Sequence, residues 1–136
     1  MIRVIPIDSG LSPEMAEAIE SFIKSNCPSG PADKAWAVYF QDGEAFKIIG
    51  FAACNIGNRI ADVPVYHVEQ GESRQEKWAG AKAHELLFAR VTGFIADTVG
   101  SGTQALFHIS PEAQEHWKEF AKTVNGRNAN RFVMEV

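Results

Sequence analysis

The alternation of hydrophobic and polar residues divides the chain into nine predicted elements. Six hydrophobic runs rich in β-branched and aromatic residues predict strands, at residues 2–7, 35–41, 47–55, 63–69, 103–109 and 131–136. Three segments in which hydrophobic residues recur at helical spacing predict helices, at residues 13–26, 74–99 and from 111 onward. The sequence therefore predicts an α+β protein with the order β-α-β-β-β-α-β-α-β.

Local signals mark the ends of these elements. The Ser-Pro pair at 12–13 is typical of a helix start, and the Gly-Ser-Gly at 100–102 is typical of a helix end. The Asp-Gly pair at 42–43, between two hydrophobic runs, predicts a hairpin turn. Ser110 is expected to cap the third helix, whose inner stripe would consist of Ala113, Trp117, Phe120 and Ala121.

Length and composition favour one globular domain over residues 1–136, because domains of about 100 to 150 residues are the commonest. The net charge of −4 and the absence of a basic stretch argue against nucleic-acid binding. No hydrophobic run is long enough to span a membrane, and the amino terminus does not resemble a signal peptide. We therefore expect a cytoplasmic protein, a monomer or homodimer, in which Cys27 and Cys54 are free thiols.

Candidate catalytic side chains lie near the end of the fourth predicted strand. His67 and Glu69 are two residues apart, so both are expected on one strand face, together with Val63 and Val65. A carboxylate or imidazole there could act as a general base. The alternative is that Glu69 is a solvated acid and His67 a hydrogen-bonded, half-buried ring. We expect no metal site, because the chain contains neither an HExxH nor a CxxC motif.

Three segments carry a resemblance to a known family: VPVYHVE followed by the long helix, TQALFHIS followed by a helix, and the closing RFVMEV. With the order of elements, which covers nearly the whole chain, they resemble the GNAT superfamily of coenzyme A dependent N-acyltransferases. The resemblance implies a mixed sheet of about six strands flanked by three helices. It also implies that the segments around Val65 and Phe107 are neighbouring parallel strands, joined by the crossover helix 74–99.

The resemblance also implies a cofactor site for acetyl-CoA or another acyl-CoA. In the family, the strand before the long helix offers backbone groups to the pantetheine arm, which assigns this role to Val65 and Val68. The following loop and helix start hold the pyrophosphate, because free N–H groups and the helix dipole favour an anion. The corresponding segment reads QGESRQEKWAGAKAHE, and its closest register places Lys77 in the basic position, Gly80 in the glycine position and Lys82 where the family has Gly or Ala. The alternative is an ordinary helix-initiating loop with solvated charges.

The segment after TQALFHIS is similar to the family's fourth helix. Ser110 stands in place of the asparagine that opens the family's segment and is the last predicted cofactor-binding residue. Ala113, His116 and Trp117 stand in the places of the family's Ala and Phe-Tyr. The family's tyrosine protonates the departing thiolate, which an indole cannot do. His116 is therefore the candidate to replace it.

Two functional hypotheses follow from the resemblance. The first is an acyl-CoA dependent N-acyltransferase that transfers an acetyl or similar group to an amine of a small molecule or protein. Glu69, His67 and His116 would then be the catalytic residues. The second is a catalytically inactive GNAT-fold binding or structural module, resembling the degenerate GNAT-like proteins of tailed phages.

Overall fold

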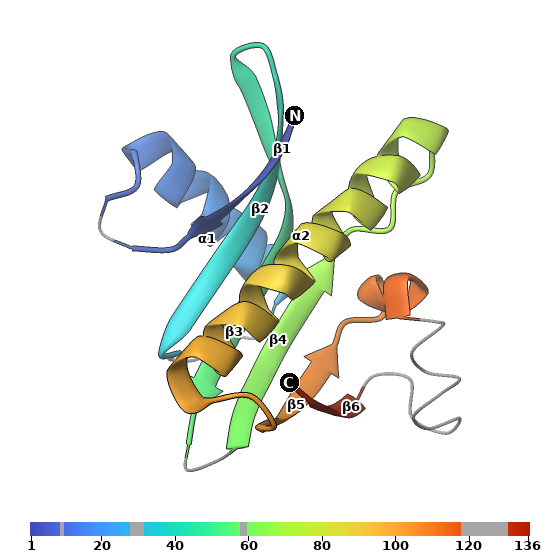
Figure 1. Ribbon diagram of the computed structural model, residues 1–136. Coiled ribbons are helices and arrows are strands. Elements are labelled where there is room, and N and C mark those ends of the chain that lie inside the picture. Colours follow the sequence, from blue (N-terminus) through green and yellow to red (C-terminus); the bar gives the residue numbers. More distant parts are fainter. Residues whose placement is uncertain (9, 28–31, 58–59, 118–130) are drawn as a thin grey trace.

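The computed structural model describes residues 1–8, 10–27, 32–57, 60–117 and 131–136. It contains one six-stranded sheet with the strands in chain order and a helix on each face (Figure 1). The elements are β1 (Ile2–Pro6), α1 (Pro13–Asn26), β2 (Lys34–Asp42), β3 (Ala45–Ile56), β4 (Ile60–Val68), α2 (Arg74–Val99), β5 (Gln104–Ile109), the 3-10 helix η1 (Ala113–Trp117) and β6 (Arg131–Glu135). This is the predicted order of elements.

The pairing of the strands confirms the mixed sheet. All neighbouring strands run antiparallel except β4 and β5, which run parallel, with Val63 opposite Phe107. Two parallel neighbours need a crossover connection, and the 26 residues of α2 provide it. The predicted parallel pair joined by the long helix is therefore confirmed.

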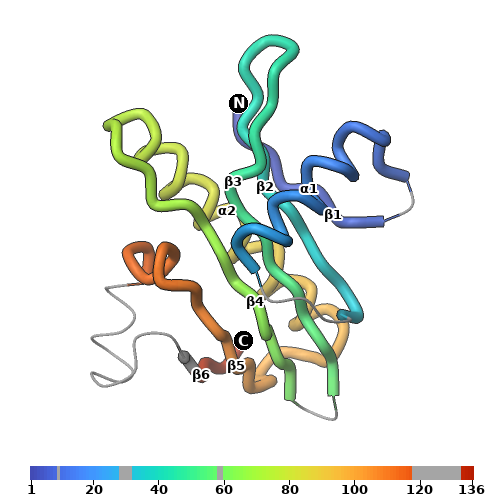
Figure 2. Tube along the Cα trace, turned by 180° about the vertical axis from the view of Figure 1, so that it is seen from behind, coloured from blue at the N-terminus to red at the C-terminus, as the bar shows by residue number. Residues whose placement is uncertain are grey.

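The two faces of the sheet carry separate hydrophobic cores, one under each α-helix (Figures 1 and 2). The core under α2 includes Leu87, Val91 and Ile95, whose spacing places them on one side of the helix. The smaller core under α1 includes Ile19 and Phe22. Both cysteines are free thiols, as predicted. None of the helices that the structure describes is long and apolar enough to cross a membrane.

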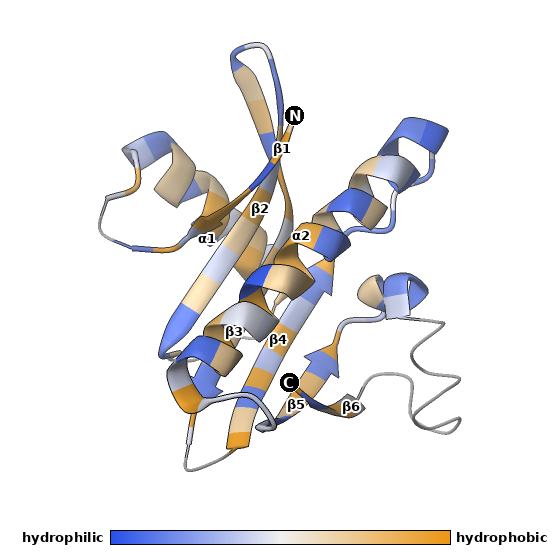
Figure 3. Ribbon diagram, in the orientation of Figure 1, coloured by the Kyte–Doolittle hydropathy of each residue, from blue (hydrophilic) through white to orange (hydrophobic). Residues whose placement is uncertain are grey.

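Capping residues fix the ends of the helices. The Ser12 hydroxyl accepts a hydrogen bond from the Met15 N–H and opens α1. At the start of α2, Ser73 and Glu76 form a capping box in which each side chain accepts the other residue's N–H. Gly100 ends α2 with a φ of +106°, a conformation that favours glycine. Hydrophilic residues dominate the first turns of α2 and the tip of the β2–β3 hairpin (Figure 3).

The third predicted helix is described only as far as Trp117, where it is the 3-10 helix η1, and the predicted stripe residues Phe120 and Ala121 lie outside the described residues. Another prediction about local structure is wrong. The sequence predicts Val63 and Val65 on the same face of β4. In the structure Val63 packs under α2, whereas Val65 packs under α1. The cause is a shift in the β4–β5 register between Val63 and Tyr66, which moves the later residues to the opposite face.

Candidate functional site at the carboxyl end of β4

The neighbouring strands β4 and β5 separate near their carboxyl ends. The last backbone hydrogen bond between these segments runs from the Ser110 N–H to the Tyr66 carbonyl, at 3.0 Å. Farther along β4, the Glu69 N–H donates to the Ile49 carbonyl of β3. Because bonded pairs alternate in an antiparallel ladder, the backbone of Val65 faces β3 and that of Val68 faces the opening beside β5. Of the two residues predicted to offer backbone groups there, Val68 has the suitable orientation.

His67 lies on the α1 face of β4 and is only 2% exposed. Its Nδ1 atom lies 2.8 Å from the Ser110 hydroxyl and 3.7 Å from a Glu112 carboxylate oxygen, while its ring packs against Phe22. Its Nε2 atom is buried and has no hydrogen-bond partner among the described residues. Burial lowers the pKa of His67, against the opposing effect of Glu112 and Glu69, so the ring is neutral near pH 7.

A cavity of about 260 Å³ opens beside His67, between the end of β4, the β4–α2 connection and the residues before η1. We call it the acidic pocket. Its lining residues are Asn26, His67, Glu69, Gln70, Gly71, Glu72 and Glu112. The lining contains three carboxylates and neither Lys nor Arg, so the pocket favours a cation.

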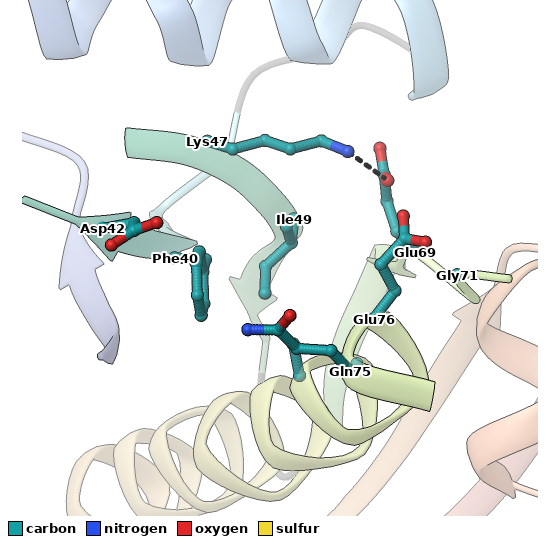
Figure 4. A pocket seen from close by; sticks show the side chains of 10 residues that line it. Phe40, Asp42, Lys47, Ile49, Glu69, Gly71, Gln75 and Glu76 are labelled. Carbon is teal, nitrogen blue, oxygen red and sulfur yellow. Dashed lines mark ion pairs between the residues drawn. The ribbon is translucent and has the colours of Figure 1, made fainter. Parts of the chain in front are cut away.

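A second cavity, of about 250 Å³, lies between the β2–β3 hairpin and the first turns of α2 (Figure 4). We call it the α2 pocket. Phe40, Ile49 and Ala79 supply apolar lining, whereas Lys47 reaches across to Glu69 with 3.6 Å between Nζ and Oε2. Other polar lining residues are Asp42, Gln75 and Glu76. Glu69 and Gly71 line both cavities, so Glu69 lies on the ridge between them.

The predicted phosphate-binding residues lie inside α2 rather than in a loop before it. The Lys77 N–H already donates to the Ser73 carbonyl, and the N–H groups of Gly80 and Lys82 lie in the interior of the helix. Lys77 is exposed, and Lys82 lies 3.7 Å from Glu85. The helix start itself is occupied by the Glu76 carboxylate, whose pKa is lowered by hydrogen bonds from Ser73. A phosphate there would meet a carboxylate, with the cations of Arg74 and Lys77 close by in the sequence.

Aromatic rings fill the space between α2 and η1. The His116 ring stacks on the His84 ring, with centroids 5.5 Å apart and planes 13° from parallel. His84 Nδ1 lies 2.8 Å from the Tyr66 hydroxyl, and the buried Trp117 ring packs edge-on against Tyr66. Burial, and secondarily His116, lowers the pKa of His84 to about 4, and burial also lowers the pKa of His116. Both imidazoles are therefore neutral near pH 7.

Comparisons with known proteins identify the fold. No family model matches the chain, and no curated protein matches its sequence. Among solved structures, N-acetylglutamate synthase from Neisseria gonorrhoeae, complexed with coenzyme A and N-acetyl-glutamate, superposes with a TM-score of 0.54 at 16% sequence identity. The match covers 99% of this chain and 35% of that protein. This chain has a GNAT-like fold.

The GNAT-like fold brings together some of the predicted site residues and separates others. His67, Glu69, Ser110 and the backbone of Val68 meet where β4 and β5 part. His116 lies on the other side of Glu69, against Gly80 of α2. Lys77, Lys82 and Val65 do not converge with this group, since the two lysines lie along α2 and the Val65 backbone faces β3.

Sequence reasoning missed three features of this candidate site. Gly71, with a φ of +75°, allows the chain to turn so tightly that an added Cβ would stand 2.6 Å from the Glu76 Cβ. A glycine three residues after a strand and directly before a capping box could have signalled that turn. The sequence around Glu112 and His84 did not indicate a role in the site, because their partners His67 and His116 belong to distant elements.

Proposed function

We propose that the chain is an acyl-CoA dependent N-acyltransferase whose acceptor is a cationic amine bound in the acidic pocket. The observation that carries the proposal is the position of this pocket. It joins three carboxylates and the buried, neutral His67 at the point where two parallel strands of a GNAT-like sheet part. The solved neighbour, which has coenzyme A bound, supports the acyl donor at the level of the fold.

The side chains of the acidic pocket suit the acceptor's chemistry. An amine arrives as an ammonium ion, which Glu72 and Glu112 attract, and it must lose a proton before its lone pair can attack. Glu69 is the first candidate to accept that proton, since it lines both cavities and its carboxylate lies 3.6 Å from Lys47 Nζ. His67, neutral on the pocket wall, is the second proton acceptor.

The donor side of the site rests on the backbone of β4. Coenzyme A supplies the acyl group as a thioester, so that a C–N bond forms as the C–S bond breaks, and coenzyme A leaves as the thiol after it takes up the proton that the amine has lost. The Val68 N–H faces the opening and could donate a hydrogen bond to the donor or to the developing oxyanion. Arg74 and Lys77 are the cations that could meet its phosphates, as point charges on the surface of α2 rather than as a phosphate-binding loop.

A second candidate function is a catalytically inactive GNAT-fold binding or structural module. Two observations favour it. The rings of His84, His116 and Trp117 fill the space between α2 and η1, and the Glu76 carboxylate occupies the helix start where a phosphate would bind. An inactive module needs neither an open groove nor a free helix start.

A thiol-release assay with acetyl-CoA and a panel of amines tests the proposal. We expect turnover with cationic primary amines and weaker turnover with amines that carry a carboxylate near the nitrogen, because the acidic pocket repels anions. Glu69→Gln should reduce kcat by about 100-fold or more, the range for loss of a general base. Glu85→Gln is the matched control, as Glu85 is exposed on α2 and lines neither cavity. Absence of thiol release with every amine, from protein that binds acetyl-CoA, would favour the inactive module.

A further inference from the structure

The His116 ring lies against the end of β4 and the inner side of α2. A Cβ built on Gly80 would stand 3.3 Å from Cε1 and 3.4 Å from Nε2 of His116, and 2.7 Å from the Glu69 carbonyl oxygen. The ring, the carbonyl and Gly80 are therefore in close mutual contact. The His116 ring thus lies beside the end of β4, next to Gly80 and the Glu69 carbonyl.

Hydrogen bonds and ring contacts hold η1 in this position, and the Ala113 and Gln114 N–H groups donate to the Ser110 hydroxyl and carbonyl. His116 stacks on His84, and Trp117 packs against both His84 and Phe88 of α2, at centroid distances of 5.6 and 5.3 Å. The Tyr66 hydroxyl fixes His84 from the sheet side through Nδ1 and the backbone carbonyl. Among the described residues, the buried His116 Nε2 has no hydrogen-bond partner. The ring is held by packing and by its interaction with the Glu69 carbonyl.

We infer that η1 is a plug over the donor side of the site, closed by the neutral His84–His116 stack and opened when these rings gain protons or are displaced by a thioester ligand. The inference rests on the proposed function for the identity of that ligand. The movement of η1 depends on the His84 and His116 rings, so it can be tested without any ligand.

The direction of the pH effect follows from burial. Each imidazole is harder to protonate in the closed form than in water, so the closed form binds fewer protons than the open form. Acid therefore favours opening, by up to tenfold per pH unit for each ring as the pH falls below the ordinary value near 6.5. Stacked imidazolium ions would also repel each other. Around the stack, Glu115 of η1 and the Glu69 carbonyl at the end of β4 favour protonated His116, and Tyr66 of β4 remains neutral because burial raises its pKa.

The first test follows the Trp117 indole N–H by NMR as the pH falls from 7.5 to 5. We expect its resonance to shift or broaden before the protein unfolds, reporting loss of the ring contacts. Replacing His84 by Asn, which cannot gain a proton, should remove most of this response, whereas His108→Asn should leave it intact. His108 is a matched control because it lies on β5, 3.4 Å from Asp62, and its ring takes part in none of the ring pairs among the described residues. A Trp117 resonance unchanged down to the unfolding pH would overturn the plug.

The second test measures acetyl-CoA affinity by calorimetry at pH 7.5. His116→Ala should bind at least tenfold more tightly than the unmodified protein, and His108→Ala should bind equally well. Equal affinities for the unmodified protein and His116→Ala would contradict the plug. If the rings respond to pH but neither protein binds acetyl-CoA, the plug stands and the proposed acyl transfer fails. The pH titration uses the unmodified protein, so it tests the plug even if His116→Ala does not fold.

Discussion

The carbonyl oxygen of Glu69 lies directly against Gly80, so closely that a Cβ on Gly80 would stand 2.7 Å from it. This contact sets how near the second turn of α2 approaches the end of β4. Because Glu69 is also the candidate base on the ridge between the two cavities, the same contact positions the strand end that carries this candidate. Only a residue without a side chain fits between these two backbones.

Gly80→Ala should therefore destabilise the protein even though alanine is the better helix former. The added Cβ must push against the Glu69 carbonyl, and a backbone atom cannot move aside as a flexible side chain can. Gly93→Ala is the matched control in the same helix, because its Cβ would meet nothing within 4 Å. That variant should gain about 0.5 to 1 kcal/mol in unfolding free energy, measured by urea denaturation. Equal effects at the two glycines would show that the contact is not a constraint.

Leu87→Ala should cost about 2 to 5 kcal/mol in unfolding free energy, through lost burial and a residual cavity. Leu87 is fully buried in the core under α2, and its neighbour Leu86 is only partly buried. Leu86→Ala makes the same chemical change and should cost clearly less. Denaturant midpoints that shift equally for both variants would show that the face of α2 is wrongly assigned.

Ser73→Ala should shorten α2 at its start and cost about 1 kcal/mol, the usual value for a lost cap. The pKa of Glu76 should rise part of the way towards 4.5, because the hydrogen bond of the Ser73 side chain is lost while the backbone N–H of residue 73 remains a donor. A carboxylate whose pKa is depressed by folding stabilises the protein above its unfolded pKa, and this contribution disappears as the pH falls. The stability difference between the two proteins should therefore shrink below about pH 4.5. NMR titration of the Glu76 carboxyl checks the shift, and an unchanged pKa would contradict the capping box.

Local signals were sufficient to predict most of the fold. The hydrophobic stripe and Gly100 predicted α2, whereas the parallel β4–β5 pair came from the resemblance to the family, with the long helix as its crossover. The face of Val63 could not be predicted, because a register shift depends on the neighbouring strand.

The candidate site was harder to predict than the fold. His67 and Glu69 could be predicted as neighbours because they are two residues apart, and the alternation of side chains along a strand places such residues on the same face. The proximity of His67 to Glu112 and the His84–His116 stack join distant elements, which periodicity along the chain does not reveal. The resemblance placed Lys77 and Lys82 at a phosphate site, but Ser73 and Glu76 begin the helix before them.

Binding of acetyl-CoA is the most direct test of the central claim, because the proposed acyl transfer cannot occur without it. We predict saturable heat in a calorimetric titration of the unmodified protein, with tighter binding at pH 6 than at pH 7.5 as the plug opens. Replacing Lys77 by Ala should weaken binding by a few-fold to tens-fold, as expected for about 1 to 2 kcal/mol from one exposed charge-assisted contact. No binding at millimolar acetyl-CoA, at either pH and with His116→Ala as well, would contradict the claim and leave a GNAT-like fold without a donor site.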